Sequence, residues 1–520
     1  MYCRSKTLLL VICLSLPAFL PTVRGQPAEI DGCPMYGCRP SGSFSFVQEV
    51  PRDNVTIGWT TGNFQGPVPD FGGCAGNGAS LVCQSNGSGP GYTGYIVLDL
   101  GSGKVLWRDL VLRLPTLPLV GFDGSFWGTD GGILMLYSAD GKSLLPEMHL
   151  DPNMRPLFGM QFVDVGYGAV LLVSQQTGEL ITTFTNGLPL ANMFLNDTVQ
   201  GVSGKFLPVA PAVTSKNRIY VLTEFAPDEN QNDVNVLGLQ RLYAIDTSTS
   251  LANGMKIVWH ANFENELPYS NVLSASLRFG SESYARRLTS TLRDPSVLKP
   301  SILWDAAVET IYLALPPPML PGSRLQGGDR LFAIQDTGKE GSMVFQAQIS
   351  VQNMVMYDGS ADRNPSNAAD QLWVSAPDGR LLAMKKTGVI GHVLDMPAIL
   401  KTNFTITSKI TTARGRGVDE DFLLFGINVQ QPTAAFKSIL SSYGVEVMSE
   451  TPANYVIGVD TPENIKGMPL AWILPTPEDT VVFGQIIGIK GDGSSIPDQL
   501  IVYSQIKQKF AKIFSIIAQK

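Results

Sequence analysis

The 520-residue sequence predicts an all-β fold, a β-propeller of about seven or eight four-stranded blades. One β-hairpin signal recurs along the chain in degenerate copies. The chain also has 52 glycines and 35 prolines, as expected of a protein with many turns, and only 16% charged residues against roughly 25% in an average soluble domain. A single core usually stops growing at about 250–300 residues, so a chain of this length needs several domains or one repeat architecture.

Residues 1–25 have the pattern of a cleaved secretory signal. Arg4 and Lys6 precede an apolar run over residues 7–20, and a small residue, Gly25, precedes a plausible cleavage site. The run is shorter than the ~20 apolar residues that span a bilayer, and a proline interrupts it, which favours a signal over a membrane anchor. The sequence therefore predicts a protein that is secreted or lies in the lumen of the secretory pathway.

The expected mature chain is acidic. Loss of the three basic residues of the signal takes the formal net charge from −7 to −10. Such a chain is a poor candidate for binding nucleic acid. No later segment is long and apolar enough to predict a transmembrane span.

Four cysteines remain after the signal: Cys33, Cys38, Cys74 and Cys83. An even number in an exported chain predicts disulfides, with three possible connectivities. The short loops favour Cys33–Cys38 and Cys74–Cys83. A zinc site is the alternative, but the histidines lie far from the cysteines in sequence and the spacings are not those of a zinc ribbon.

Four glycosylation sequons predict a glycoprotein of the eukaryotic secretory pathway. Their acceptor residues are Asn54, Asn86, Asn196 and Asn403. Residues 26–90 are otherwise rich in Gly, Pro, Cys and Ser, with short strand signals at 44–47 and 55–59. Because this region has little core of its own, we expect it to lie on the rest of the protein and to lend a strand to the first or last sheet.

The recurring hairpin is clearest at residues 95–107, where two β-rich apolar runs flank a turn with two glycines. Related strand signals follow at 121–127, 132–145, 169–181, 217–222, 241–246, 257–259, 309–313, 330–339, 371–374, 380–388, 421–427, 453–459 and 481–489. These units predict a propeller over residues 91–490. A sandwich would not repeat this turn chemistry, and a solenoid would have shorter units.

Several of the turns resemble the PQQ-like repeat of quinoprotein propellers, approximately Ala-x-Asp-x-x-Thr-Gly-Lys-x-x-Trp. The resemblance covers about residues 91–390, and its residues include Val97, Asp99, Ser102, Gly103, Lys104, Trp107, Ala244, Asp246, Trp259, Thr337, Gly338, Lys339, Ala383, Thr387 and Gly388. In that family the tryptophan packs between neighbouring blades. The resemblance therefore implies structural, blade-docking roles for Trp107 and Trp259.

The resemblance does not carry over an activity. Quinoprotein dehydrogenases hold the quinone against a tryptophan and a disulfide of adjacent cysteines, with Ca²⁺ held by Glu and Asn and an Asp as base. This chain has no adjacent cysteines and no motif onto which those residues can be placed. The carboxylates of 228–233 and 419–421 fit solvated loops better than a calcium loop or a catalytic pair. The sequence predicts no catalytic residue, metal site or cofactor, with quinone or Ca²⁺ left open.

The stretch 491–520 is predicted to be a linker followed by a C-terminal amphipathic helix. Its apolar residues recur at helical spacing: Val502, Ile506, Phe510, Ile513, Phe514 and Ile517. Such a helix would pack on the propeller. As an alternative, it would make a peripheral contact with a membrane or a partner through 497–520.

These features favour a secreted, non-catalytic propeller that binds an extracellular protein or glycan through its loops, with 223–240 and 314–329 as the best candidates. An extracellular quinone-dependent oxidoreductase with an atypical site is the first alternative. A glycan-active enzyme is the second.

Overall fold

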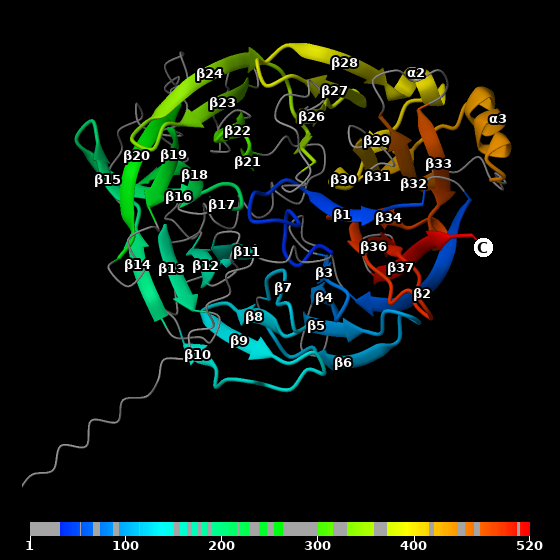
Figure 1. Cartoon of the computed structure of the whole chain (residues 1–520), viewed down its shortest axis with the longest axis horizontal. Coiled ribbons are helices and arrows are strands. Elements are labelled where there is room, and N and C mark those ends of the chain that lie inside the picture. Colours follow the sequence, from blue (N-terminus) through cyan, green and yellow to red (C-terminus); the bar gives the residue numbers. More distant parts are fainter. Residues whose placement is uncertain are drawn as a thin grey trace, which may run out of the picture.

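In the computed structural model the strands of the described residues form eight sheets that follow one another around a ring, which is a β-propeller with one sheet per blade (Figure 1). Five sheets have four strands, one has five and two have six. The all-β propeller predicted from the sequence is confirmed. The structure describes residues 32–519 except 52–53, 66–72, 87–92, 114, 150–155, 164–168, 175–177, 185–188, 216–217, 229–238, 247–253, 264–299, 316–329, 358–371, 415–420, 446–452, 462–468 and 507–509.

Blades 1 to 4 follow one another in chain order. Blade 1 contains β3 (Cys74–Gly76), β4 (Leu81–Asn86), β5 (Thr93–Leu98) and β6 (Val105–Asp109). Blade 2 contains β7 (Leu119–Val120), β8 (Phe126–Asp130), β9 (Ile133–Tyr137) and β10 (Met148–His149). Blade 3 contains β11 (Pro156–Val163), β12 (Ala169–Ser174), β13 (Glu179–Phe184) and β14 (Pro189–Phe194). Blade 4 contains β15 (Asn196–Val199), β16 (Val202–Pro208), β17 (Val213–Ser215), β18 (Arg218–Pro227), β19 (Gln240–Asp246) and β20 (Lys256–Phe263).

Blades 5 to 8 complete the ring. Blade 5 contains β21 (Ser301–Asp305), β22 (Thr310–Leu315), β23 (Arg330–Asp336) and β24 (Gly341–Gln348). Blade 6 contains β25 (Asn353–Val355), β26 (Leu372–Ser375), β27 (Arg380–Met384) and β28 (Ile390–Asp395). Blade 7 contains β29 (Thr405–Ile406), β30 (Thr411–Arg414), β31 (Asp421–Val429), β32 (Ala453–Asp460) and β33 (Leu470–Pro475). Blade 8 contains β34 (Val481–Val482), β35 (Ile487–Ile489), β36 (Gln499–Ile506) and β37 (Phe510–Ala518).

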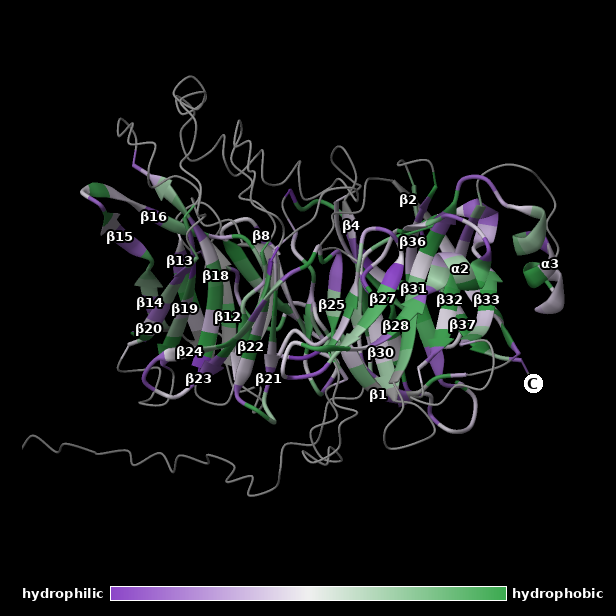
Figure 2. Cartoon of the chain, turned by 90° about the horizontal axis from the view of Figure 1, so that it is seen from above, coloured by the Kyte–Doolittle hydropathy of each residue, from purple (hydrophilic) through white to green (hydrophobic). Residues whose placement is uncertain are grey.

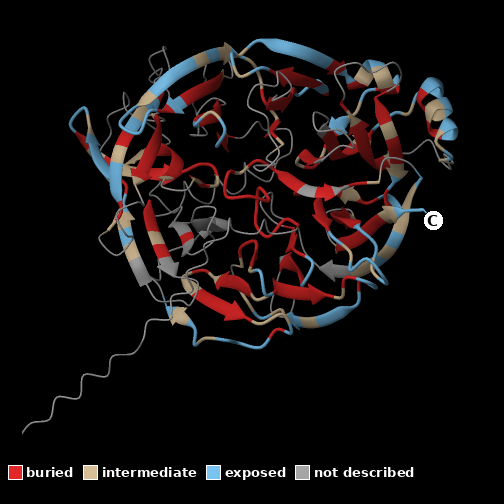
Figure 3. Ribbon diagram, viewed as in Figure 1, coloured by how far each residue is buried: buried red, intermediate tan, exposed pale blue. Residues whose placement is uncertain are grey.

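Exposure rises from the middle of the ring to its rim (Figure 3). Every residue of β5 and of β22 is buried, because neighbouring blades cover both faces of these sheets. Strands buried on both faces have nearly continuous apolar sequences. The outermost strands β6, β20 and β24 are only partly buried. Seen from the side, the strands stand upright between the two faces of the ring (Figure 2).

The N-terminal region supplies a strand to each of the last two blades. β1 (Ser45–Glu49) pairs in parallel with β30 of blade 7, and β2 (Val55–Gln65) pairs antiparallel with β37 of blade 8. The two ends of the chain thus close the ring together, and β2 agrees with the expectation that this region lends a strand to the last sheet.

The propeller extends beyond the predicted range 91–490 at both ends. The strands β3 and β4, over residues 74–86, belong to blade 1. The predicted C-terminal helix is wrong, because residues 499–506 and 510–518 are the strands β36 and β37. Val502, Ile513 and Phe514 are fully buried in blade 8. This burial removes the basis for an amphipathic helix over 497–520 that would contact a membrane or a partner.

Two short α-helices of the described residues lie beside blades 6 and 7, where α2 contacts β27, β28 and α3. In α2 (Met396–Leu400) the Asp395 side chain caps the first turn, and in α3 (Ala434–Ser442) the Thr433 side chain does the same. A 3-10 turn, η4 (Pro477–Asp479), precedes β34. Among the described residues, no helix has the length and apolar character needed to cross a membrane.

Candidate functional site: the filled channel and the blade seams

The middle of the ring is occupied by the chain's own N-terminal segment, residues 33–46, which we call the hub (Figure 1). The side chains of Cys33, Met35, Cys38 and Phe46 are fully buried. An innermost blade strand has one edge facing the channel, so its N–H and C=O groups need partners there. The hub supplies such partners.

Backbone hydrogen bonds join the hub to six blades. The pairs are Cys33 with Gly76 (2.9 Å, in both directions), Val120 N to Pro34 O (2.8 Å), Thr214 N to Pro40 O (2.7 Å), Trp304 N to Ser41 O (2.9 Å), Met356 N to Ser43 O (3.2 Å) and Thr412 N to Phe44 O (2.9 Å). These partners belong to blades 1, 2, 4, 5, 6 and 7. The hub therefore fastens the inner strands of distant blades to one another.

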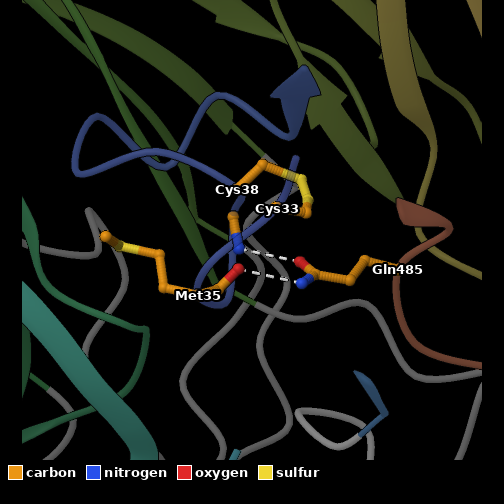
Figure 4. The surroundings of a disulfide bond; sticks show 5 residues. Cys33, Met35, Cys38 and Gln485 are labelled. Carbon is orange, nitrogen blue, oxygen red and sulfur yellow. Dashed lines mark hydrogen bonds between the residues drawn. A yellow bond between two sulfur atoms is a disulfide. The ribbon is translucent and has the colours of Figure 1, made fainter. Parts of the chain in front are cut away.

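Blade 8 holds the hub through a side chain, Gln485 (Figure 4). The amide oxygen of Gln485 accepts from Gly37 N at 2.9 Å, and its amide nitrogen donates to Met35 O at 2.9 Å. Gly37 has φ 81°, and a Cβ placed on it would lie 2.9 Å from the Cα of Gly42, so only glycine fits. The Cys33–Cys38 disulfide closes this loop.

A small pocket remains beside the hub. Tyr36 and Phe44 form one wall, with their rings edge to face at 5.1 Å, and the other lining residues include Lys409, Pro211 and Pro300. The Lys409 ammonium lies 5.9 Å from the centre of the Phe44 ring. The pocket holds about 20 Å³, which is room for about one water molecule. A polycyclic quinone does not fit in it.

Both disulfides favoured by the short loops are confirmed. Cys33 pairs with Cys38 in the hub, and Cys74 pairs with Cys83 across the neighbouring strands β3 and β4. A zinc site built from these four cysteines is excluded, because each is bonded to another cysteine. Within the described ranges, no group of three or more His, Cys, Asp or Glu residues is placed to hold a metal ion.

Trp259 lies on the outermost strand of blade 4 and reaches blade 5. Its indole N–H donates to Asp336 Oδ1 at 2.9 Å, and a Cβ placed on Gly341 would lie 2.9 Å from its ring. Asp336 also accepts from the Tyr220 hydroxyl at 2.7 Å, and Arg218 Nε lies 3.3 Å from Oδ2. Burial, followed by the Asp336 carboxylate, raises the pKa of Tyr220 well above its usual value. One buried carboxylate thus ties two blades together.

Trp107 lies in the seam between blades 1 and 2. Its ring centre is 5.1 Å from that of Tyr137 and 6.0 Å from that of Phe126. Gly141, in the next turn, has φ 80°, and a Cβ there would collide with the indole. Two similar contacts were not predicted from the sequence. Trp59 on β2 covers Gly103 of blade 1, and Phe345 on β24 covers Gly388 of blade 6.

A bulge on the outermost strand aims each of the seam aromatics in blades 1, 4 and 5. The pairing registers leave Leu106, Val258 and Val344 unpaired, each immediately before the aromatic residue. The residue opposite the aromatic is Ala244 in blade 4 and Ala333 in blade 5. A small side chain there leaves room for the ring, which gives the alanine of the repeat motif a physical role.

A second charged cluster fixes the base of the β15–β16 hairpin on blade 4. Arg241 Nη1 lies 2.5 Å from Asp197 Oδ2, its Nε donates to Asn262 Oδ1 at 2.7 Å, and its guanidinium sits 4.0 Å above the centre of the Phe206 ring. Burial acts to raise the pKa of Asp197, but Arg241 outweighs it and the pKa is lowered. Burial, then the Arg241 charge, lowers the pKa of His260.

Three sequon asparagines are exposed: Asn54, Asn196 and Asn403. Asn86 ends β4, and its side chain is outside the described residues. Most of the two inserts proposed as binding loops, 223–240 and 314–329, is also outside them, as are the sequences 229–233 and 419–420. Asp228 is described, and its backbone N–H donates to Ser203 O at 2.9 Å.

The sequence matches no protein-family model and no curated protein. Solved structures with similar shape include BamB from Moraxella catarrhalis (11% identity, TM-score 0.37, covering 72% of this chain and 90% of that one). A second is BBS1N in complex with ARL6DN (9% identity, TM-score 0.35, covering 90% of this chain and 98% of that one). A third is the β-propeller domain of Myceliophteria thermophila Cps50 (Swd1) (10% identity, TM-score 0.37, covering 88% of this chain and 100% of that one). Likenesses this distant carry no argument about function, and the fold rests on the sheet topology above.

Proposed function

We propose that this chain is a secreted, non-catalytic β-propeller of the PQQ-like repeat type that binds an extracellular protein or glycan through its loops. The filled channel carries the proposal. The hub takes up the middle of the ring, and the pocket described beside it holds about 20 Å³, which favours ligand recognition on the two faces, where the loops lie.

Two features of the described residues support an oxidising compartment. Both disulfides are buried, with none of the four cysteines more than 1% exposed, and such bonds persist mainly in secreted proteins. Asn54, Asn196 and Asn403 are exposed, as expected of residues that carry glycans. These observations agree with the signal-like sequence of residues 1–25.

The test is to express the full chain in a secreting eukaryotic cell line and to titrate the purified protein with pyrroloquinoline quinone and Ca²⁺. We expect the protein in the medium with its N-terminus at Gln26, a fall in mass on glycosidase treatment, and no stoichiometric quinone absorption band. A stoichiometric band would overturn the proposal in favour of an oxidoreductase. Hydrolysis of one member of a glycan panel would overturn it in favour of a glycan-active enzyme. Retention inside the cells would refute secretion.

A further inference from the structure

Blade 5 differs from most of the ring in that its outermost strand, β24, has no charged residue and no proline along its edge. Proteins usually protect an edge strand with charged residues, proline or a covering element, because its free N–H and C=O groups pair readily with another strand. Most outermost strands here have such guards: Arg108 and Asp109 in β6, Pro189 in β14, Lys256 and His260 in β20, His392 and Asp395 in β28, and Pro475 in β33. β10 has two residues only, and two register irregularities interrupt β2.

β24 has none of these guards. Its eight residues, Gly-Ser-Met-Val-Phe-Gln-Ala-Gln, include no charge and no proline. It is the last strand of its sheet, and no described strand pairs with its outer edge. Bulges like the one at Val344 also occur in the guarded strands β6 and β20, so the bulge does not distinguish β24 from them. The stretches on either side of it are regularly paired with β23.

The exposed side chains of β24 are uncharged, and several of those around this edge are apolar; Ser342, Gln346 and Gln348 of β24 and His392 and Asp395 of β28 are exposed as well. On β24, Met343 is 52% exposed and Val344 46%, and across the seam Val389 is 60%, Ile390 46% and Val393 43% exposed. Phe345 joins the two groups, since it packs on the turn that leads into β28. Figure 1 shows β24 and β28 as neighbours on the rim, and Figure 3 shows both largely exposed.

We propose that this surface is a self-association site, on which β24 of one copy pairs antiparallel with β24 of a second copy. A two-fold axis perpendicular to the paired strands would place β24 opposite itself with no like charges facing each other, since β24 has no charged residue. The exposed apolar residues, Met343 and Val344 on β24 and Val389, Ile390 and Val393 across the seam, would then pack around the paired strands. A second copy supplies what this edge can pair with, a ladder of backbone groups on a strand without charge.

The size of the surface predicts a weak dimer. Eight strand residues extend about 27 Å, and a strip of that length about 10 Å wide buries roughly 500 Å² in total, half of the roughly 1,000 Å² expected of a stable interface. The exposed apolar residues Val389, Ile390 and Val393 must supply the rest of the buried area. We therefore expect a dissociation constant in the micromolar range, with monomer at high dilution.

The test is sedimentation equilibrium of the full-length secreted protein from sub-micromolar to several hundred micromolar. Val344→Lys should raise the dissociation constant at least tenfold. Leu106→Lys is the matched control, because Leu106 holds the same bulge position in blade 1 and is 61% exposed. We expect Leu106→Lys to dimerise like the wild type. If Val344→Lys alters thermal unfolding, Met343→Lys replaces it as the test variant, and it should raise the dissociation constant by a similar factor.

Hydrogen exchange gives an independent readout, since amides of residues 341–348 should gain protection as the protein concentration rises. A wild type that stays monomeric at every concentration would overturn the proposal, as would equal loss of dimer in Leu106→Lys. A wild type that stays monomeric yet binds an uncharged strand peptide of unrelated sequence would also overturn it, and would indicate a strand from another protein as the occupant.

Discussion

Replacing Gln485 by leucine tests whether the hub holds the propeller together. The Gln485 amide makes two buried hydrogen bonds, to Gly37 N and to Met35 O, across more than 440 residues of sequence. Leucine has a similar volume but can make neither bond. The substitution therefore leaves one N–H and one C=O of the hub buried without these partners.

The expected cost follows from those two groups. A buried backbone group that loses its partner costs about 1–3 kcal/mol, and the added apolar contact of leucine offsets part of the sum. We expect the free energy of unfolding to fall by about 3 kcal/mol. With an unfolding entropy of about 2 cal/mol/K per residue, a chain of this size should lose about 3 °C in Tm.

Scanning calorimetry measures the Tm, and hydrogen exchange locates the effect. Peptides from residues 33–46 should be strongly protected in the wild type and should lose protection first in Gln485→Leu. Gln335→Leu is the control, because Gln335 is an exposed residue of β23, and its Tm should stay within about 1 °C of the wild type. If the hub exchanges as fast as an exposed loop in the wild type, the reasoning is wrong.

Three further predictions concern the hub, one seam and the β15–β16 hairpin. Joint replacement of Cys33 and Cys38 by alanine should cost about 2 kcal/mol, since the disulfide closes a short loop, and should reduce exchange protection of the hub before that of the blades. Gly141→Ala should lower the Tm clearly more than Gly201→Ala in thermal melts: both glycines have positive φ, but only at Gly141 would the new Cβ meet an indole. The pKa of His260 is lowered in the fold, so its contribution to stability is present above about pH 6.5 and is lost as the pH falls. Acidification to about pH 5 should therefore lower the Tm of the wild type more than that of His260→Gln, and equal shifts would contradict this.

The blades could be predicted from the sequence because their signals are local. The apolar run at 95–98, the two-glycine turn and the run at 105–107 lie within a dozen residues, and the structure places β5 and β6 there. The disulfides were predictable for the same reason, since each joins cysteines within ten residues.

The C-terminal strands were missed because burial on both faces hides the β period. β36 and β37 are buried along almost their whole length, so their apolar residues do not alternate with polar ones. Such a run resembles a helical face. The excess of β-branched residues, with Ile501 and Val502 in one strand and Ile513, Ile516 and Ile517 in the other, was the available signal for strands.

The hub could not be predicted because nothing in residues 33–46 identifies its partners. The segment is a glycine-rich loop, and its hydrogen bonds reach residues as distant as Thr412 and Gln485. Seam aromatics on a strand contributed by the other end of the chain, such as Trp59, were missed for the same reason. Among the seam aromatics, only Trp107 and Trp259 follow the repeat motif, so only these two could be predicted from the sequence.

The position of the hub has a consequence for biosynthesis. Residues 33–46 leave the ribosome before any of the blades, yet the strands that bury them are spread along the chain as far as blade 8. Met35 and Phe46 therefore stay without their native packing while several hundred further residues are made. The ring can close only when residues 510–518 arrive to pair with β2. A segment made before the blades is thus among the last to reach its final environment, and the nascent chain needs protection from aggregation until blade 8 has been made.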